Sequence, residues 1–180
     1  AYQIGGVVTK PDEPAGRKKI LTPPPVKVFA GQHGIPVFQP EKLKSELWDQ
    51  EIPRADLFVV AAYGKIIPKS VLSIPKFGTL NIHPSLLPRW RGASPIQSAI
   101  LADDGDTGVT IMQLDEQMDH GPIVAQKVVH IGPRKVRYKE LHDELAEIGA
   151  ELLVGTISGY VSGTVIPAPQ DNAKATYCKI

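Results

Sequence analysis

Residues 55–62 read Ala-Asp-Leu-Phe-Val-Val-Ala-Ala, and the apolar part of this run has no polar alternation. Such a run is typical of a strand that is buried on both faces of a sheet. Other short apolar or β-branched runs predict further strands at residues 4–9, 35–38, 78–83, 107–114 and 123–131. The chain therefore contains the elements of a sheet with several strands.

The stretches between these strands carry helical signals. Prolines predict helices that begin near residues 25 and 95, since proline is tolerated in the first turn, and that run to about Gln32 and Ala102. Apolar residues at helical spacing predict another helix within 41–50 and a long one from Leu141 towards Gly163. Because strands and helices alternate, we expect an α/β fold: a Rossmann-like open twisted sheet, mostly parallel, with helices on both faces.

Composition restricts the class of protein. The chain has 180 residues, 42% of them hydrophobic, and its 20 Lys and Arg nearly balance 19 Asp and Glu. These values fit one globular domain over residues 1–180 and argue against a basic protein that coats a polyanion. Its single cysteine, Cys178, cannot form an internal disulfide, and no stretch approaches the roughly 20 apolar residues that cross a bilayer. We therefore expect a cytoplasmic protein that does not contact membranes.

Asn81 and His83 are two residues apart on a predicted strand, so both side chains leave the same face, while Leu80 and Ile82 leave the other. Pro84 stops the strand directly afterwards. The pair therefore lies at the carboxyl end of the strand, where open α/β sheets place their ligand crevices. The alternative is that Asn81 satisfies loop backbone groups and that His83 is a packed histidine.

Further polar residues lie close to this pair in the sequence or in a neighbouring predicted loop. Asp119 lies between two predicted strands, and a carboxylate beside His83 would favour the imidazolium, although Asp119 is also an ordinary turn residue. Arg89 and Arg91 can clamp a carboxylate or phosphate, or lie solvated around Trp90. No Gly-x-Ser-x-Gly elbow and no zinc-ligand spacing is present, so we expect neither a serine nucleophile nor a metal site.

Residues 81–92, Asn-Ile-His-Pro-Ser-Leu-Leu-Pro-Arg-Trp-Arg-Gly, together with Met-Asp-His-Gly-Pro at 118–122, resemble the folate-dependent formyltransferases. Residues 9–17, 25–27, 36–40 and 62–68 are similar to the branch of that family that acts on methionyl-tRNA. The resemblance covers essentially the whole chain. It implies the formyltransferase fold, without the strand, loop and helix that open the family's sheet and without its C-terminal barrel domain of the oligonucleotide-binding kind.

The resemblance also implies a reaction: transfer of a formyl group from 10-formyltetrahydrofolate to the amino group of methionine on initiator tRNA, without a metal. It implies that Asn81, His83 and Asp119 are catalytic and that the protein acts as a monomer. The residues that it places against the folate are Tyr63, Gly64, Lys65, Ile66, Ile67, Ser85, Leu86, Leu87, Pro88, Arg91, Gln117 and Met118. Those that it places against the tRNA acceptor arm, mostly in the basic loop 10–22, are Lys10, Arg17, Lys18, Lys19 and Lys27.

Several points stay open at the level of the sequence. Asn81 and a His83 imidazolium held by Asp119 can each donate to the developing oxyanion, and the proton of the attacking amine can leave through His83 or through water held by Asp119. The acceptor can instead be a small amine, such as glycinamide ribonucleotide or an amino sugar nucleotide. A truncated module that binds folate or tRNA without turnover is a third alternative.

Overall fold

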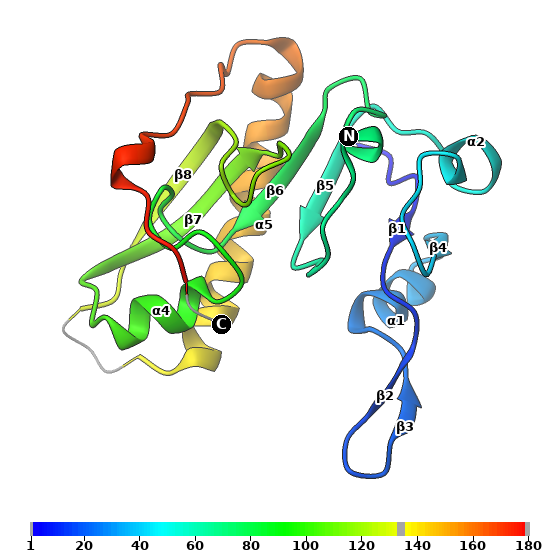
Figure 1. Cartoon of the computed structure of the whole chain (residues 1–180), viewed down its shortest axis with the longest axis horizontal. Coiled ribbons are helices and arrows are strands. Elements are labelled where there is room, and N and C mark those ends of the chain that lie inside the picture. The colour runs from blue at the N-terminus through cyan, green and yellow to red at the C-terminus, as the bar shows by residue number, and fades with distance from the viewer. Residues whose placement is uncertain (1, 133–135, 179–180) are drawn as a thin grey trace. The chain divides into compact units, whose positions relative to one another are not determined.

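The computed structural model describes residues 2–132 and 136–178 (Figure 1). The chain forms two compact units. Unit 1 consists of the residues up to 56 together with 65–76, and unit 2 consists of 57–64 together with the chain from Phe77 onwards. Strands and helices alternate along the chain, which confirms the predicted α/β class.

Unit 2 is built on a four-stranded sheet. Its strands are β5 (Phe58–Ala61), β6 (Thr79–His83), β7 (Asp106–Gln113) and β8 (Ile123–His130), and they lie side by side in that order. β5 and β6 are parallel, whereas the pairs β6/β7 and β7/β8 are antiparallel. The sheet of unit 2 is therefore mixed, and the predicted parallel pairing holds for β5/β6 and for β1/β4 in unit 1.

The antiparallel pairing of β7 and β8 follows from the connection between them. Residues 114–122 contain no helix, and a connection of this length joins antiparallel strands, whereas parallel neighbours need a crossover of a dozen residues or more. The prediction that β5 is buried on both faces is wrong. β5 lies at the edge of its sheet, and its residues alternate between half-buried and exposed, with Val59 45% exposed.

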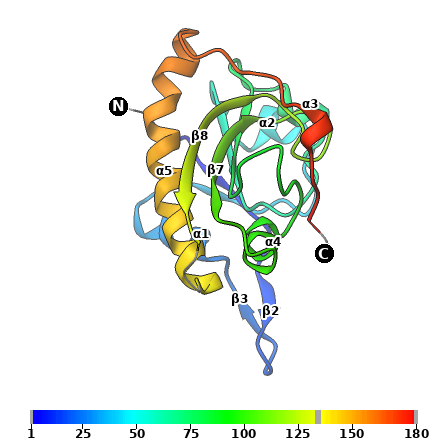
Figure 2. The same cartoon turned by 90° about the vertical axis from the view of Figure 1, so that its left-hand side faces the viewer.

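Both longer helices of unit 2 pack on one face of this sheet. α4 (Pro95–Leu101) contacts α5 (Tyr138–Ser162), and the apolar side chains of both helices join one core with those of β6, β7 and β8. Figure 2 shows α5 running along β7 and β8. The core that results contains Leu80, Ile96, Ala99, Val109, Ile111, Leu141, Leu145 and Ile157. α5 ends where the sequence predicts, because Gly163 adopts the left-handed conformation with φ +77°.

Two irregular segments complete unit 2. The loop of residues 84–92 covers the sheet face opposite α5, where the Leu87 amide and the Ser85 carbonyl both bond to the Thr110 hydroxyl. The C-terminal segment, residues 163–178, returns across the same unit and forms isolated bridges from Ala168 to Ile123 and from Tyr177 to Arg91. It includes the short 3-10 helix η1 (Asn172–Lys174).

Unit 1 contains β1 (Val7–Val8) and β4 (Val37–Phe38), which pair in parallel, with α1 (Pro25–Gln32) between them in the chain. Its other helices are short: α2 (Leu47–Gln50) and α3 (Lys69–Leu72). The strand predicted over 4–9 is thus paired only at Val7–Val8, and the helix predicted within 41–50 forms only its last turn.

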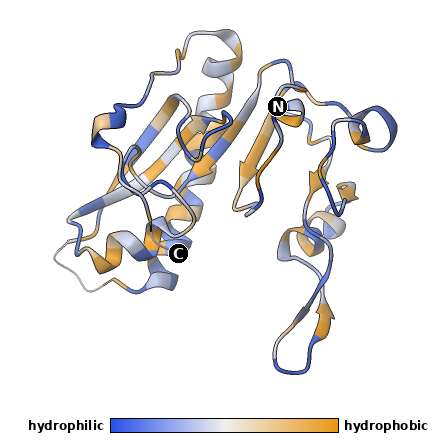
Figure 3. Cartoon of the chain, in the orientation of Figure 1, coloured by the Kyte–Doolittle hydropathy of each residue, from blue (hydrophilic) through white to orange (hydrophobic). Residues whose placement is uncertain are grey.

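The sequence pattern predicted an irregular basic loop at residues 10–22. The structure instead contains an antiparallel hairpin there, formed by β2 (Glu13–Ala15) and β3 (Ile20–Thr22). All its strand residues are exposed, and β3 is nevertheless hydrophobic (Figure 3). The apolar residues of β3 do not pack into a core. The sequence therefore lacks the alternation of apolar and polar residues that predicts a half-buried strand. Gly16 and Lys19 close the turn with positive φ angles.

Candidate active site

Asn81 and His83 of β6 project from the face opposite α5. A Cβ atom on Gly149 of α5 would lie 2.8 Å from Cγ2 of Ile82, so Ile82 faces this helix. Since successive side chains of a strand alternate, Asn81 and His83 face the other side, under loop 84–92. The predicted shared face of Asn81 and His83 is confirmed, and β6 ends at His83, as the following proline predicts.

His83 and Asp119 come together from a strand end and from the loop between β7 and β8. Nδ1 of His83 lies 3.7 Å from Oδ1 of Asp119, and both side chains are largely buried. The second oxygen of Asp119 accepts a 2.7 Å hydrogen bond from the Gly92 amide. The carboxylate therefore faces the imidazole with one oxygen while the other is tied to the end of loop 84–92.

The hydrogen bond on the other side of the ring decides the tautomer of His83. Its Nε2 lies 2.9 Å from the carbonyl oxygen of Trp90, which can only accept, so Nε2 carries a proton. In the neutral imidazole the free lone pair is then on Nδ1, the nitrogen that faces Asp119. Burial lowers the pKa of His83, against the opposing effects of the Asp119 carboxylate and the Trp90 carbonyl. Nδ1 is therefore the ring nitrogen that can take up a proton.

The backbone around this pair is held in unusual conformations. Asp119 and Trp90 have φ angles of +47° and +61°, which non-glycine residues rarely adopt. Gly121 is required where it stands, because a Cβ atom there would lie 1.8 Å from the carbonyl oxygen of Gln113. Residues kept in such conformations are concentrated at functional sites, where the surrounding contacts over-determine them.

Asn81 is half-buried, and its neighbours across the sheet are Val60 and Met112. Within the described part of its own unit, its side-chain amide has no hydrogen-bond partner. The amide NH₂ on this face is thus available as a donor to a bound molecule.

The arginines of loop 84–92 are not available as an anion clamp. Arg89 forms an ion pair with Asp104, and its guanidinium lies 4.6 Å from the centre of the Trp90 ring. Asp104 also accepts a hydrogen bond from the Trp90 indole. Arg91 is only 2% exposed, and its guanidinium donates to the side-chain oxygens of Gln170, Asn172 and Tyr177. Both arginines therefore fix the loop.

The remaining predicted folate residues of this loop form its scaffold. Ser85 is fully buried and donates its hydroxyl to the Arg89 carbonyl at 2.6 Å, and the buried Leu87 precedes a cis peptide bond to Pro88. Leu86 is half-buried. A ligand at this loop would therefore meet its surface contour and its backbone groups rather than free polar side chains.

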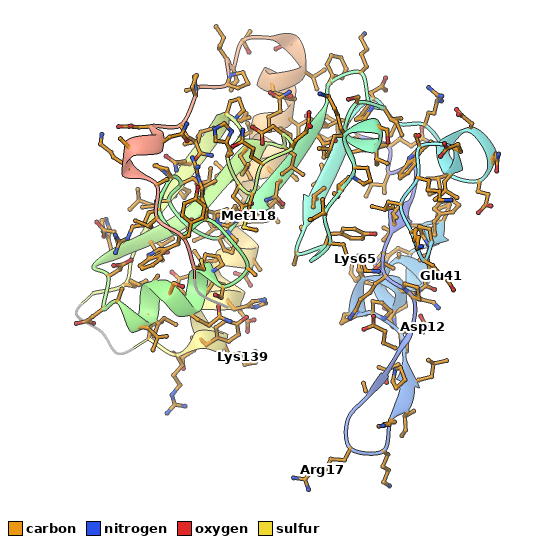
Figure 4. All side chains as sticks on the ribbon, in the orientation of Figure 1. Asp12, Arg17, Glu41, Lys65, Met118 and Lys139 are labelled. Carbon is orange, nitrogen blue, oxygen red and sulfur yellow. The ribbon has the colours of Figure 1, made fainter. Side chains whose placement is uncertain are left out.

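The other predicted folate residues are divided between the units. Gln117 and the 64% exposed Met118 lie beside Asp119, and Figure 4 labels Met118 on this loop. Tyr63 and Gly64 follow β5 in unit 2, and burial raises the pKa of the Tyr63 phenol. Lys65, Ile66 and Ile67 belong to unit 1.

All five predicted tRNA contacts belong to unit 1. Lys10 and Lys27 form ion pairs with Glu13 and Asp12, so their charges are partly compensated. Arg17, Lys18 and Lys19 at the hairpin turn are exposed and have no ion-pair partner within the described part of the unit. Figure 4 shows the Arg17 side chain pointing outward from the turn.

Sequence reasoning missed Gln170, whose side chain bonds to both loops of the site. It lies in an irregular segment directly after Pro169, where no spacing or motif marks it. Over residues 2–132 and 136–178, no group of three or more His, Cys, Asp and Glu side chains is placed to hold a metal ion. In the same residues, no helix is long and apolar enough to cross a bilayer.

Comparisons with known proteins support the fold. The Formyl transferase family matches residues 2–157. Phosphoribosylglycinamide formyltransferase from Bacillus halodurans superimposes with a TM-score of 0.66 at 30% identity, over 79% of this chain and 78% of that one. A formyltransferase from Anoxybacillus kamchatkensis, solved with tetrahydrofolate, has a TM-score of 0.68 at 23% identity, over 96% of this chain and 84% of that one, which supports the fold alone. The chain belongs to the formyltransferase family.

Within this family, the chain is similar to methionyl-tRNA formyltransferases. It is 51% identical to that of Chloroflexus aurantiacus, covering 99% of this chain and 58% of the relative. It is 48% identical to that of Bacillus velezensis, covering 98% of this chain and 56% of the relative. The chain thus spans somewhat more than half the length of these relatives.

Proposed function

We propose that this protein transfers a formyl group from 10-formyltetrahydrofolate to the amino group of methionyl initiator tRNA. The observation that carries the proposal is the pairing of the buried His83 with Asp119, on the sheet face where the Asn81 amide has no hydrogen-bond partner within the described part of its unit. The names of the curated relatives support the acceptor, and tetrahydrofolate bound to a structural relative supports the donor.

The chemistry needs no protein nucleophile, because the amine itself attacks the formyl carbon. As the new C–N bond forms, negative charge develops on the formyl oxygen. The Asn81 amide is the donor that we assign to this oxygen. Loss of one such donor costs about 10² to 10³ in rate.

His83 is the group that we assign to the proton of the attacking amine. Because Nε2 donates to the Trp90 carbonyl, Nδ1 is the nitrogen that accepts this proton. The imidazolium that forms is stabilised by the Asp119 carboxylate 3.7 Å away. When the bond from the formyl carbon to N10 breaks, the His83 imidazolium gives its proton to N10, and tetrahydrofolate leaves as a neutral amine.

The surrounding loops supply binding. We assign the folate to residues 63–67, 85–88, Arg91 and 117–118, with Ser85 and Arg91 contributing through the loop they hold in place. We assign the tRNA acceptor arm to Lys10, Arg17, Lys18, Lys19 and Lys27, whose positive charge complements phosphates. The reaction is proposed for a cytoplasmic monomer without a metal.

An acceptor panel tests this function. The protein is incubated with 10-formyltetrahydrofolate and, separately, charged initiator tRNA, glycinamide ribonucleotide or an amino sugar nucleotide, and the formylated product and tetrahydrofolate are measured. We expect formylation of the tRNA, reduced to background in His83→Ala. Formylation of a small amine alone would replace the acceptor, and folate or tRNA binding without transfer to any amine would leave a binding module.

A further inference from the structure

Gln170 of the C-terminal segment joins the two loops that carry the site. Its Oε1 accepts from Nε and a terminal nitrogen of Arg91 at 3.1 and 2.7 Å. Its Nε2 donates to the carbonyl oxygens of Asp119 and Gly121 at 2.9 and 2.8 Å. With 9% of its surface exposed, Gln170 satisfies both amide hydrogens and uses its amide oxygen twice.

Only one orientation of this amide satisfies its neighbours. If the amide were turned over, its NH₂ would face the donors of Arg91 and its oxygen would face two carbonyl oxygens. Arg91 has donors alone, and it is itself held by Asn172 and Tyr177. Arg91 therefore fixes the direction in which Gln170 donates.

The two carbonyls that accept from Gln170, those of Asp119 and Gly121, belong to the turn that orients the Asp119 side chain. The Asp119 backbone has a φ angle of +47°, which costs free energy unless neighbouring contacts maintain it. The Asp119 side chain has a single hydrogen bond of its own in the described part of the chain, from the Gly92 amide. Two backbone contacts from Gln170 thus restrain the peptide units around this residue, alongside the contacts of the His120 ring with Asp115 and Asn172.

We propose that Gln170 is a positioning residue of the formyl transfer reaction, which holds the Asp119 carboxylate at Nδ1 of His83 through the backbone of the 119–121 turn. This inference rests on the proposed function. Gln170 touches neither reactant in this scheme. It acts through Asp119, and its loss moves that carboxylate away from the imidazole.

A double-mutant cycle tests this dependence. In the wild-type background we expect Gln170→Met to lower kcat about 10- to 100-fold with little change in the KM for the folate, because a small misplacement of a catalytic group has effects of that size. In the Asp119→Asn background the same change should lower kcat by less than a factor of two. Equal losses in both backgrounds would overturn the proposal.

Two further variants separate positioning from a general loss of structure. Gln126→Met removes another glutamine that anchors loop 84–92, through the Leu87 carbonyl and Thr110, without touching Asp119. Its effect should be the same in both backgrounds. Gln170→Glu keeps an acceptor for Arg91, but its carboxylate cannot donate to the two carbonyls. It should therefore show the same loss of kcat as Gln170→Met, and it provides the test if Gln170→Met folds poorly. Wild-type kcat in Gln170→Glu would overturn the proposal.

A measurement without substrate separates this inference from the proposed function. The pKa of His83 is followed by NMR of the ring protons in the wild type, Gln170→Met, Gln126→Met and Asp119→Asn. Asp119 is the charged residue that interacts with His83, and it raises the pKa of the ring. We expect Gln170→Met to lower the pKa in the same direction as Asp119→Asn, and Gln126→Met to leave it unchanged. If the pKa of His83 is unchanged in Gln170→Met, the positioning role is overturned, even if formyl transfer is confirmed. If the pKa of His83 is lowered in Gln170→Met but the wild type transfers no formyl group, only the proposed function is refuted.

Discussion

Nδ1 of His83 lies 3.7 Å from Oδ1 of Asp119, and the opposite ring nitrogen donates to the carbonyl of Trp90. These contacts bring together the end of β6, the turn after β7 and the loop at 84–92. The ring is thereby held from both sides, with its basic nitrogen directed to the carboxylate.

Removal of either Asn81 or His83 should abolish most of the activity. We expect His83→Ala to lower the rate of tRNA formylation by about 10² to 10⁴, the usual contribution of a general base. Asn81→Ala should lower it by about 10² to 10³ through loss of one oxyanion donor. Single-turnover rates with 10-formyltetrahydrofolate measure both effects, and thermal unfolding checks that the variants fold. Near wild-type rates in Asn81→Ala would exclude it as a donor.

The pH dependence of the reaction should report on His83. The neutral ring is the active form, so kcat/KM should be lost as the pH falls through the pKa of His83, which burial places below its usual range. The Asp119 carboxylate raises that pKa, so Asp119→Asn should move the acidic limb to lower pH while reducing the maximal rate.

A matched variant in the same loop provides the control for this shift. Asp115 pairs with His120, not with His83. Asp115→Asn should therefore leave the acidic limb where it is in the wild type. A pH profile that moves equally in both variants would show that the shift arises from the loop as a whole and would contradict the assignment to Asp119.

The basic turn of the β2/β3 hairpin should control the salt dependence of tRNA binding. For each of Arg17, Lys18 and Lys19 that contacts a phosphate, replacement by Ala should reduce the slope of log K against log salt by about 0.9. Affinity titrations at several salt concentrations measure this slope. Lys139→Ala, which removes an exposed charge from α5 in unit 2, should leave the slope unchanged. An unchanged slope in the triple variant would remove the hairpin from the interface.

Two glycines of α5 should respond oppositely to alanine. Gly155 has open space around it, so Gly155→Ala should stabilise the protein by about 0.5–1 kcal/mol, the usual difference in helix propensity. At Gly149 a Cβ atom would lie 2.8 Å from Cγ2 of Ile82, on a β-branched side chain of a central strand. Overpacking of this kind costs about 1–3 kcal/mol, so Gly149→Ala should be the less stable variant in denaturant unfolding. Equal stability would contradict the packing of α5 on β6.

Local sequence patterns predicted the helices and strands whose buried residues recur at a regular spacing. α5 and its end at Gly163, the helix after Pro95, and the shared face of Asn81 and His83 were all predictable, because period, proline position and strand alternation are properties of adjacent residues. The β2/β3 hairpin was not predicted, since its exposed strands have no such burial pattern. The exposed face of β5 was missed for a different reason: hydrophobicity does not show whether another element covers each face of a strand.

The sequence by itself determined the α/β class, the long helix and the candidate trio, the last through motifs that match a known family. Tertiary structure alone decided that His83 faces Asp119, that Arg89 and Arg91 are used internally, and that Gln170 joins both loops. These contacts connect residues far apart in the chain. They depend on how strand ends and loops fold back on each other, and no local pattern records which distant donor meets which acceptor.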